Sequence, residues 1–224
     1  MGKDAEVISR REEHLEDTRR GIIEAARELF TEQGYTATSI EEIVARARVT
    51  KGAMYHHFGS KEEVFRIVLD AVESGFINRL AEKGMPGDDV WIEIQNGVQA
   101  FLDVALEPEI QQIVLIDGPA VLGWPEWRAV EARYGFGLLR KFLARAMDAG
   151  FLPPQPLEPL VHLLAGALNE GAMAIAHADN RRAARAEVGE AVAWVLGSLG
   201  RRPPRDAPSD PAPDLSSALR GWPS

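Results

Sequence analysis

The stretch TSIEEIVARARVTKGAMYHHFGSKEEV, residues 38–64, carries a helix start signal near each end. Ser39 with Glu42, and Ser60 with Glu63, have the S-x-x-E spacing of a capping box. In that motif the serine side chain bonds a backbone N–H one turn into the helix, and the glutamate bonds back to the serine N–H. Two helices are therefore predicted to begin at these serines.

A third start lies between them. Thr50 is a favoured N-cap residue, so the stretch predicts short helices at 39–47 and 51–57, joined by the brief ARVT connection. Two short helices braced by a longer one have the dimensions of a helix-turn-helix. Because any helical bundle can contain short helices, the faces of helix 51–57 are the stronger evidence.

Helix 51–57 has one apolar side. At 100° per residue, Met54 and Phe58 fall together, where they can pack against the neighbouring helices. The opposite side carries no large apolar group, since it holds Gly52, Ala53 and His56, with Tyr55 and His57 on the flanks. The outward face is therefore available to a polar partner.

The same window is locally basic although the chain is acidic overall. The net charge of -9 argues at first against nucleic acid, because neutralising phosphates takes clustered Lys and Arg. Between Glu42 and Glu62, however, there is no acidic residue. The positive charges of the window are Arg46, Arg48, Lys51 and Lys61.

The outward residues each suit a contact with a DNA duplex. Lys51 can donate to a guanine edge or a phosphate, and Gly52 lets the backbone approach the bases. Tyr55 and His57 can donate to phosphate oxygens. Lys61, beside the free amides of a helix N-terminus, predicts a phosphate site.

Simpler interpretations exist for several of these residues. Tyr and His on a short helix are often half-buried packing residues, and Arg46 and Arg48 can be solvated charges. The adjacent His56 and His57 suggest a metal pair, but neighbours in a helix point 100° apart and no third ligand lies nearby. No metal site is predicted.

The motif also carries a resemblance. IIEAARELFTEQGYTATSIEEIVARARVTKGAMYHHFGSKEEVF lies within a match from about Thr18 to Val68 and resembles the DNA-binding domain of TetR-family (tetracycline-repressor-like) transcriptional regulators. In that family the third helix, here 51–57, is the recognition helix. The positions that match the family's usual DNA contacts are Thr38, Ser39, Thr50, Lys51, Gly52, Tyr55, His56, His57 and Lys61.

Arg48 departs from the family pattern, which usually has glycine in this turn. An arginine there would either strain the turn or add a phosphate contact. The sequence does not decide between them.

The whole chain is expected to be all-α, because no run alternates with period two. Outside the motif, helices are predicted from Leu15 to a stop at Gly34, from Ser60 to the glycines near 84, and at 89–106, 108–116, 125–148, 158–178 and 182–199. The expected organisation is a mobile arm (1–14), a three-helix DNA-binding domain with its linker helix (15–84), a larger helical domain (85–199) and a proline-rich, disordered tail (200–224).

The resemblance implies that residues 85–199 form a regulatory domain that dimerises and binds a small molecule. Independently, helices 158–178 and 182–199 mix branched and small residues, which lets helices approach closely. Paired across a two-fold axis they would form a four-helix interface. The alternative is that they pack within one subunit.

A pocket for a small hydrophobic or amphipathic ligand would be mostly apolar with a few polar groups. Candidate wall residues are Phe101, Trp124, Trp127, Tyr134 and Phe136, and candidate polar contacts are Asp117, His162 and Asn169. No cofactor is implied.

The sequence thus favours a homodimeric DNA-binding regulator, a repressor that binds an inverted-repeat operator and is released by an effector. The sequence contains no nucleophile motif and no phosphate loop that would indicate an enzyme. The remaining alternative is a helical scaffold protein that does not bind DNA. With no cysteine, no signal peptide and no uninterrupted apolar span, a cytoplasmic protein without a membrane segment is expected.

Overall fold

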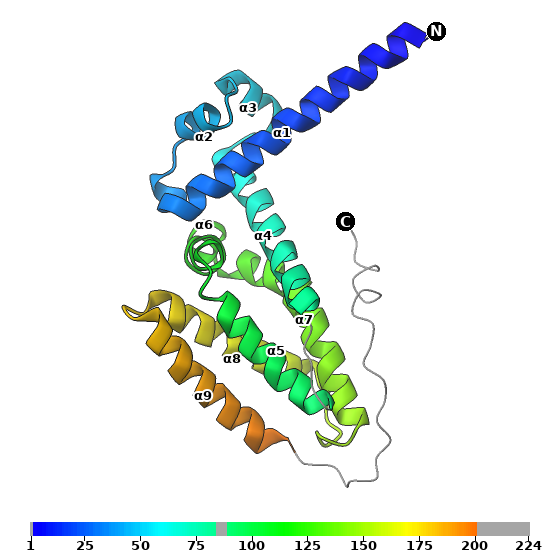
Figure 1. The fold of residues 1–224 in the computed structure, drawn as a ribbon, viewed down its shortest axis with the longest axis vertical. Coiled ribbons are helices and arrows are strands. Elements are labelled where there is room, and N and C mark those ends of the chain that lie inside the picture. The colour runs from blue at the N-terminus through cyan, green and yellow to red at the C-terminus, as the bar shows by residue number, and fades with distance from the viewer. Residues whose placement is uncertain (1, 84–88, 201–224) are drawn as a thin grey trace.

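The computed structural model describes residues 2–83 and 89–200, with side chains described for 15–80 and 89–200. Every regular element in these residues is a helix. In chain order they are α1 (Gly2–Ala37), α2 (Ile40–Arg46), α3 (Lys51–His57), α4 (Lys61–Lys83), α5 (Val90–Val104), η1 (Ile110–Asp117), α6 (Gly118–Leu122), α7 (Trp124–Asp148), α8 (Leu157–His177) and α9 (Arg181–Leu199) (Figure 1). The all-α prediction is confirmed.

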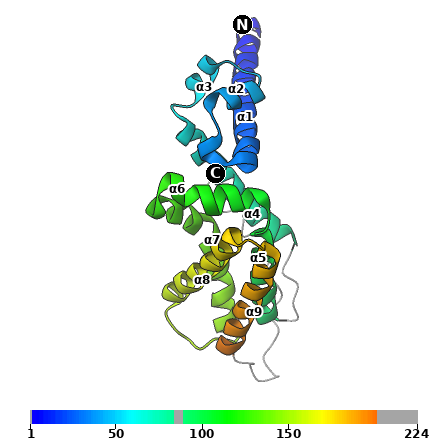
Figure 2. The same cartoon turned by 90° about the vertical axis from the view of Figure 1, so that its left-hand side faces the viewer.

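The helices form an elongated molecule with two ends. At one end α2 and α3 pack against α1 (Figure 1). We call this unit, which comprises residues 15–57, the head. At the other end α5, α7, α8 and α9 form a bundle (Figures 1 and 2). The long helix α4 runs from the head into the bundle, and η1 with α6 lies between the two (Figure 2). Both α1 and α4 contact η1.

The core of the head confirms the predicted inner side of α3. Met54 and Phe58 are fully buried against Ile22 and Phe30 of α1 and Ile43 of α2. Burying one such side chain contributes about 1.5–3 kcal/mol. Two apolar side chains therefore hold this short helix in place and leave its other face outward.

The predicted caps are largely present. Glu42 N–H donates to Ser39 Oγ at 3.2 Å and Ser39 N–H donates to Glu42 Oε2 at 2.8 Å, which completes the capping box of α2. Ala53 N–H donates to Thr50 Oγ1 at 3.1 Å. At α4 the box is one-sided, because Glu63 accepts from Gly59 N–H rather than from Ser60.

Two predicted boundaries differ from the structure. α1 begins at Gly2, so the backbone of the segment expected to be a mobile arm is helical; its Ala, Glu, Arg and Leu residues are good helix formers. Gly34 does interrupt α1, with φ of 79°, but helical turns continue to Ala37. The tail predicted from residue 200 lies, beyond Gly200, outside the described residues.

The helix predicted at 108–116 is instead a π-helix, η1, followed directly by α6. The indole N–H of Trp127 donates to the Val114 carbonyl at 2.9 Å. A Cβ at Gly118 would lie 2.8 Å from the Trp127 ring, so only glycine fits beneath it. No local sequence pattern predicts this contact between η1 and α7.

α8 is the one helix among the described residues that is long and apolar enough to cross a membrane, by length and composition only. In the fold it packs against α7 and α9 and buries Val161, Ala165 and Ile175. Core helices pass the same test, and packing accounts for this side of α8.

Arg48 lies where α2 ends and adopts φ of 57°, the only positive φ of a non-glycine residue in the described part of the chain. Val49 N–H donates to Val44 O at 3.0 Å and Arg48 N–H to Ala45 O at 3.2 Å, which are the two bonds of a Schellman motif. The motif needs a left-handed residue after the cap, and a side chain there costs about 1–2 kcal/mol. The strained turn is therefore present, whereas a phosphate contact by Arg48 stays a prediction.

We expect Arg48→Gly to raise the free energy of unfolding by about 0.5–1 kcal/mol, because relief of the left-handed strain exceeds the extra entropy of glycine in the unfolded chain. Urea denaturation measures the change. Arg48→Ala is the control, since it removes the same side chain and keeps the strain. Equal stability of the two variants would contradict this explanation.

Candidate DNA interface and ligand cavity

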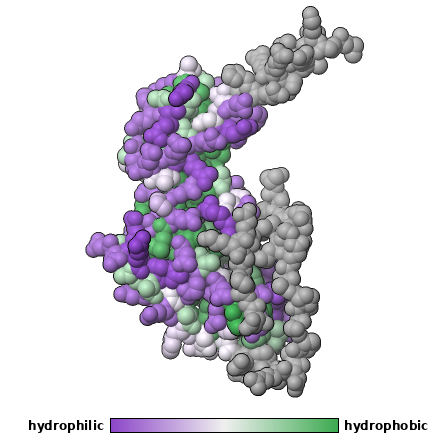
Figure 3. All heavy atoms as spheres, viewed as in Figure 1, coloured by the Kyte–Doolittle hydropathy of each residue, from purple (hydrophilic) through white to green (hydrophobic). Residues whose placement is uncertain are grey.

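The outward face of α3 is open to solvent. Lys51, Gly52 and His56 are exposed, the Tyr55 side chain is 49% exposed, and His57 is half-buried. Most of the surface over α1, α2 and α3 is hydrophilic in the view of Figure 3. Five of the predicted DNA contacts are thus brought together on one short helix.

Two of the positive charges near this face, Lys51 and Arg46, are already paired with carboxylates. Lys51 Nζ lies 2.5 Å from Glu41 Oε1, and this hydrogen bond raises the pKa of Lys51. Arg46 pairs with Glu28 and Glu32 of α1, each at 3.0 Å. Exposed pairs of this kind contribute only about 0–1 kcal/mol, so a phosphate can replace the carboxylate at little cost.

Two predicted contacts are not on this face. Thr38 is 1% exposed, and its hydroxyl donates to the Gly34 carbonyl at 2.8 Å. Lys61 Nζ donates to the carbonyls of Tyr35 and Thr38 at 2.8 and 2.7 Å and lies 4.0 Å from the centre of the Tyr35 ring. The outward position expected for Lys61 is corrected, because Lys61 and Thr38 both satisfy backbone groups where α1 ends, and a direct DNA contact by either side chain stays a prediction.

Ser39 and Thr50 have a structural use as well. Their hydroxyls accept the capping bonds of α2 and α3. A hydroxyl that accepts a capping bond can still donate its own proton to a phosphate oxygen, and the Ser39 hydroxyl already donates to Glu42 Oε2 at 2.7 Å.

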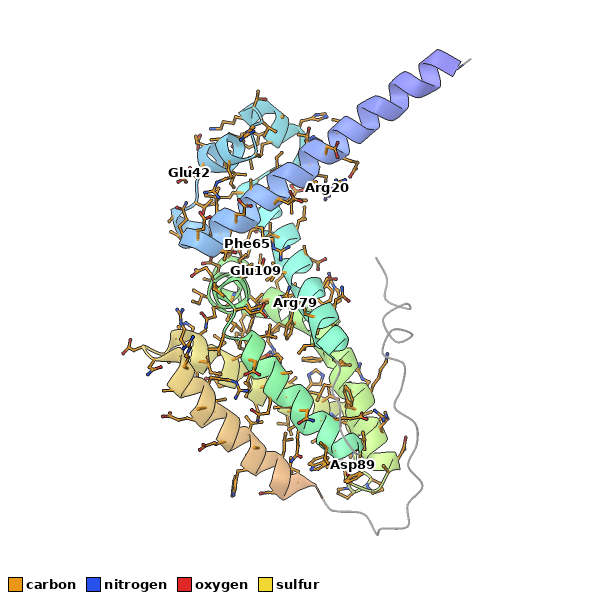
Figure 4. All side chains as sticks on the ribbon, in the orientation of Figure 1. Arg20, Glu42, Phe65, Arg79, Asp89 and Glu109 are labelled. Carbon is orange, nitrogen blue, oxygen red and sulfur yellow. The ribbon has the colours of Figure 1, made fainter. Side chains whose placement is uncertain are left out.

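Asp117 was expected in the ligand pocket, but it joins η1 to the head. Its Oδ2 accepts from the Tyr35 N–H at 2.7 Å. At the other end of η1, Glu109 accepts from Arg27 Nη2 at 2.9 Å, and Figure 4 shows Glu109 beside the junction of α1 with the bundle. A Cβ on Gly34 would lie 2.9 Å from Gln112 Nε2, so η1 approaches α1 closely.

A cavity of about 120 Å³ lies inside the bundle, many times the space that one water needs. Helices α4, α5, η1, α7 and α8 all contribute to its wall, which is almost entirely apolar. Side chains of η1 that line it are Ile110, Val114 and Leu115. One helix, η1, thus contacts both the cavity and the head.

Three of the predicted ligand residues line this cavity, namely Phe101, Phe136 and Asn169. The other five do not. Trp124 is exposed, Trp127 is buried against η1, and Asp117 bonds to the head. Tyr134 interacts with Asp70, and His162 is exposed with its ring edge-on to Phe136 at 4.9 Å.

Sequence reasoning missed both charged residues of the cavity wall, Glu73 of α4 and Glu131 of α7. Burial, together with the negative charges of Glu131 and Asp70, raises the pKa of Glu73 to about 8. Burial raises the pKa of Glu131 to about 7, against the lowering effect of Arg128. Their signal in the sequence is a carboxylate on an apolar helix face, as Leu69, Glu73 and Phe76 show.

Among the described residues, no group of three or more His, Cys, Asp or Glu could hold a metal ion. The rings of His56 and His57 lie edge to face with centres 5.4 Å apart.

Comparison with known proteins identifies both halves. Residues 22–68 match the family described as "Bacterial regulatory proteins, tetR family", and residues 91–199 match the "Tetracyclin repressor-like, C-terminal domain". The chain is 26% identical over 195 residues to the Transposon Tn10 TetC protein of Escherichia coli, covering 84% of this chain and 93% of that protein.

Solved structures share the fold. A TetR-family transcriptional regulator from Pectobacterium atrosepticum is 32% identical with a TM-score of 0.75, covering 85% of this chain and 98% of that one. The transcriptional regulator FadR from Bacillus subtilis, solved in complex with stearoyl-CoA, is 18% identical with a TM-score of 0.65, covering 80% and 97%. The similarity to FadR shows a shared fold and nothing further.

The buried carboxyl of Glu73 should make stability depend on pH. Its pKa is about 8 in the folded chain against 4.5 as the ordinary value, so the folded state holds its proton longer and stability falls as pH rises through this range. At about 1.4 kcal/mol per pKa unit, Glu73→Gln should be a few kcal/mol more stable than wild type near pH 8 and similar near pH 4.5. Denaturation curves across this range measure the difference. The exposed Asp148→Asn is the control, and an unchanged pH slope in Glu73→Gln would refute the assignment.

Proposed function

The chain belongs to the TetR family and is a helix-turn-helix transcriptional regulator, and on this basis we propose that it is a homodimeric repressor whose operator is released when a small ligand fills the cavity. Its relatives are transcriptional regulators. The observation that carries the proposal is one helix, η1, bonded to the DNA-binding head on one side and lining an apolar cavity on the other. The cytoplasm, where bacterial DNA lies, is its proposed place of action.

The proposed DNA contacts come from α3 and the first turn of α2. α3 would lie in the major groove, with Lys51 exchanging Glu41 for a base or phosphate. The proposed contact set is Ser39, Thr50, Lys51, Gly52, Tyr55, His56 and His57. Thr38 and Lys61 are proposed to act indirectly, by holding the end of α1 against which α2 and α3 pack.

The proposed dimer forms through α8 and α9. Leu163 on α8 is 72% exposed and Trp194 on α9 is 75% exposed, which is unusual for large apolar side chains. Ala167 and Ala174 continue the exposed side of α8 at helical spacing. Small residues beside large exposed ones favour close packing with the same helices of a second copy.

We propose that the switch is a change in the position of η1. A ligand in the cavity would press on Val114 and Leu115, and η1 would carry the shift to α1 through Asp117 and Glu109. In a dimer, tilting both heads alters the distance between the two recognition helices, which must match half-sites about 34–36 Å apart or a multiple. Only a ligand that binds the two states differently can shift this equilibrium. FadR, crystallised with stearoyl-CoA, supports an organic ligand by analogy of fold.

Selection from random duplexes with the purified protein should yield an inverted repeat. Against that consensus, Lys51→Ala and Tyr55→Ala should each lower affinity by about 10-fold or more, and Lys51→Ala should also reduce the salt dependence by about one phosphate contact. Arg182→Ala, which removes an exposed cation at the start of α9, is the matched control. If no repeat emerges, or if duplex binding shows no salt dependence, a scaffold without DNA recognition is the better interpretation.

Trp194→Glu should convert dimer to monomer in sedimentation velocity, because a charge would be buried at the centre of the interface; a loss of about 2 kcal/mol or more weakens the dimer some 30-fold. Trp124→Glu is the control, since Trp124 is also an exposed tryptophan but lies at the start of α7. Retention of the dimer by Trp194→Glu, or equal dissociation of both variants, would place the interface elsewhere.

A further inference from the structure

The cavity wall carries an unbalanced set of charges. Its polar groups are Glu73, Glu131 and Asn169, and the parts of α5, η1 and α8 that line it bring no charged side chain. Such groups are expensive inside an apolar wall unless something compensates them. The partners of each carboxyl therefore decide whether its charge is compensated.

Glu131 is compensated within the chain. Its Oε2 accepts from Arg128 Nη1 at 3.0 Å and from Asn169 Nδ2 at 2.5 Å. The Arg128 guanidinium also lies 5.5 Å from the centre of the Phe136 ring, which fixes it beside the cavity. One positive and one negative charge thus neutralise each other on the α7 side.

Glu73 has no such partner. Its side chain is 5% exposed, and it makes no hydrogen bond or ion pair in the described part of the chain. The charges that act on it are Glu131 of α7 and Asp70 on its own helix, both negative. Asp70 is itself paired with Arg133 at 3.0 Å, so that arginine is engaged elsewhere.

We propose that the ligand is an apolar organic molecule with a single positive charge, and that its cationic group lies against the Glu73 carboxylate while its apolar part lies among Phe76, Phe101 and Phe136. This inference deepens the proposed function and rests on it, since it assigns a chemical class to the effector of the same cavity. The ring centres of Phe76 and Phe101 are 5.6 Å apart and face the cavity from α4 and α5.

Charge balance decides for a cation. Arg128, Glu131 and Glu73 sum to one negative charge when both carboxyls are ionised, and a monocation makes the site neutral. An anion would gain no ion pair from Glu73, whose carboxyl would have to stay protonated beside it. Aromatic faces add attraction for a cation in a desolvated site, and a charged partner is what an isolated buried carboxylate lacks.

Binding of a cation should also release a proton. Glu73, with a pKa of about 8 in the empty cavity, is mostly protonated at neutral pH. A cation favours its ionised form. Affinity for a permanent cation should therefore rise with pH and level off above about 8.

Three probes of nearly equal shape distinguish the possible ligand classes: benzyltrimethylammonium, a permanent cation; neopentylbenzene, its uncharged isostere; and pivalophenone, which offers a carbonyl acceptor. Calorimetric titration of the full chain between about pH 6 and pH 9 measures affinity and proton release. We expect the cation to bind at least about 10-fold more tightly than either neutral probe near pH 8, with up to one proton released below it.

Two variants test the site. Glu73→Gln should lose at least about 10-fold in affinity for the cation, abolish its pH dependence and leave neopentylbenzene unaffected. Asp148→Asn removes an exposed carboxylate and should change nothing. Gly135→Leu should abolish binding of all probes, because a Cβ at Gly135 meets no atom within 4 Å and the side chain would fill the cavity.

A cation that binds no more tightly than its neutral isostere, absence of binding included, would overturn the proposal. Tighter binding of pivalophenone would show instead that Glu73 serves as a neutral donor. Operator binding is measured separately. If the cation binds through Glu73 without weakening the operator complex, the ligand class stands and the effector role fails; if operator recognition fails, the calorimetry is unaffected.

Discussion

The end of α1 depends on side chains from two other elements. Gly34 interrupts the helix and leaves backbone groups without their usual partners. Asp117 of η1 accepts from the Tyr35 N–H, and Lys61 of α4 donates to the carbonyls of Tyr35 and Thr38. Buried or half-buried backbone groups are costly when unpaired. The head, the linker helix and the bundle therefore meet at one hydrogen-bonded junction.

This junction is the path along which the proposed switch would carry a change in the bundle to the DNA-binding face. η1 is short, and its side chains divide between the cavity and α1, so it cannot shift toward one without altering its contact with the other. π-helical turns are a common feature of functional segments. Trp127 anchors η1 from α7 through the Val114 carbonyl, so the bundle also limits where η1 can move.

The junction stabilises the fold, whereas the cavity contains groups that destabilise it. Burial in an apolar wall raises the pKa values of the two carboxyls, Glu73 and Glu131. Their ionisation therefore lowers the stability of the empty protein at neutral and higher pH. Perturbed groups of this kind gather at functional sites. Glu131 is offset by Arg128 and Asn169, whereas Glu73 makes no hydrogen bond or ion pair in the described part of the chain.

The helix-turn-helix could be predicted from the sequence, because its signals are local. The capping residues Ser39 and Thr50, and the burial of Met54 and Phe58, depend on spacing within one or two turns. Tertiary structure alone decided the inward positions of Thr38 and Lys61, the bond from Asp117 to the head and the burial of Glu73 beside Glu131. These contacts join residues that are far apart along the chain or belong to different helices. The helical period of a sequence does not specify which helix packs against a given face. The same polar residue is therefore equally consistent with a surface contact, a hydrogen bond to the backbone or a place in a cavity wall.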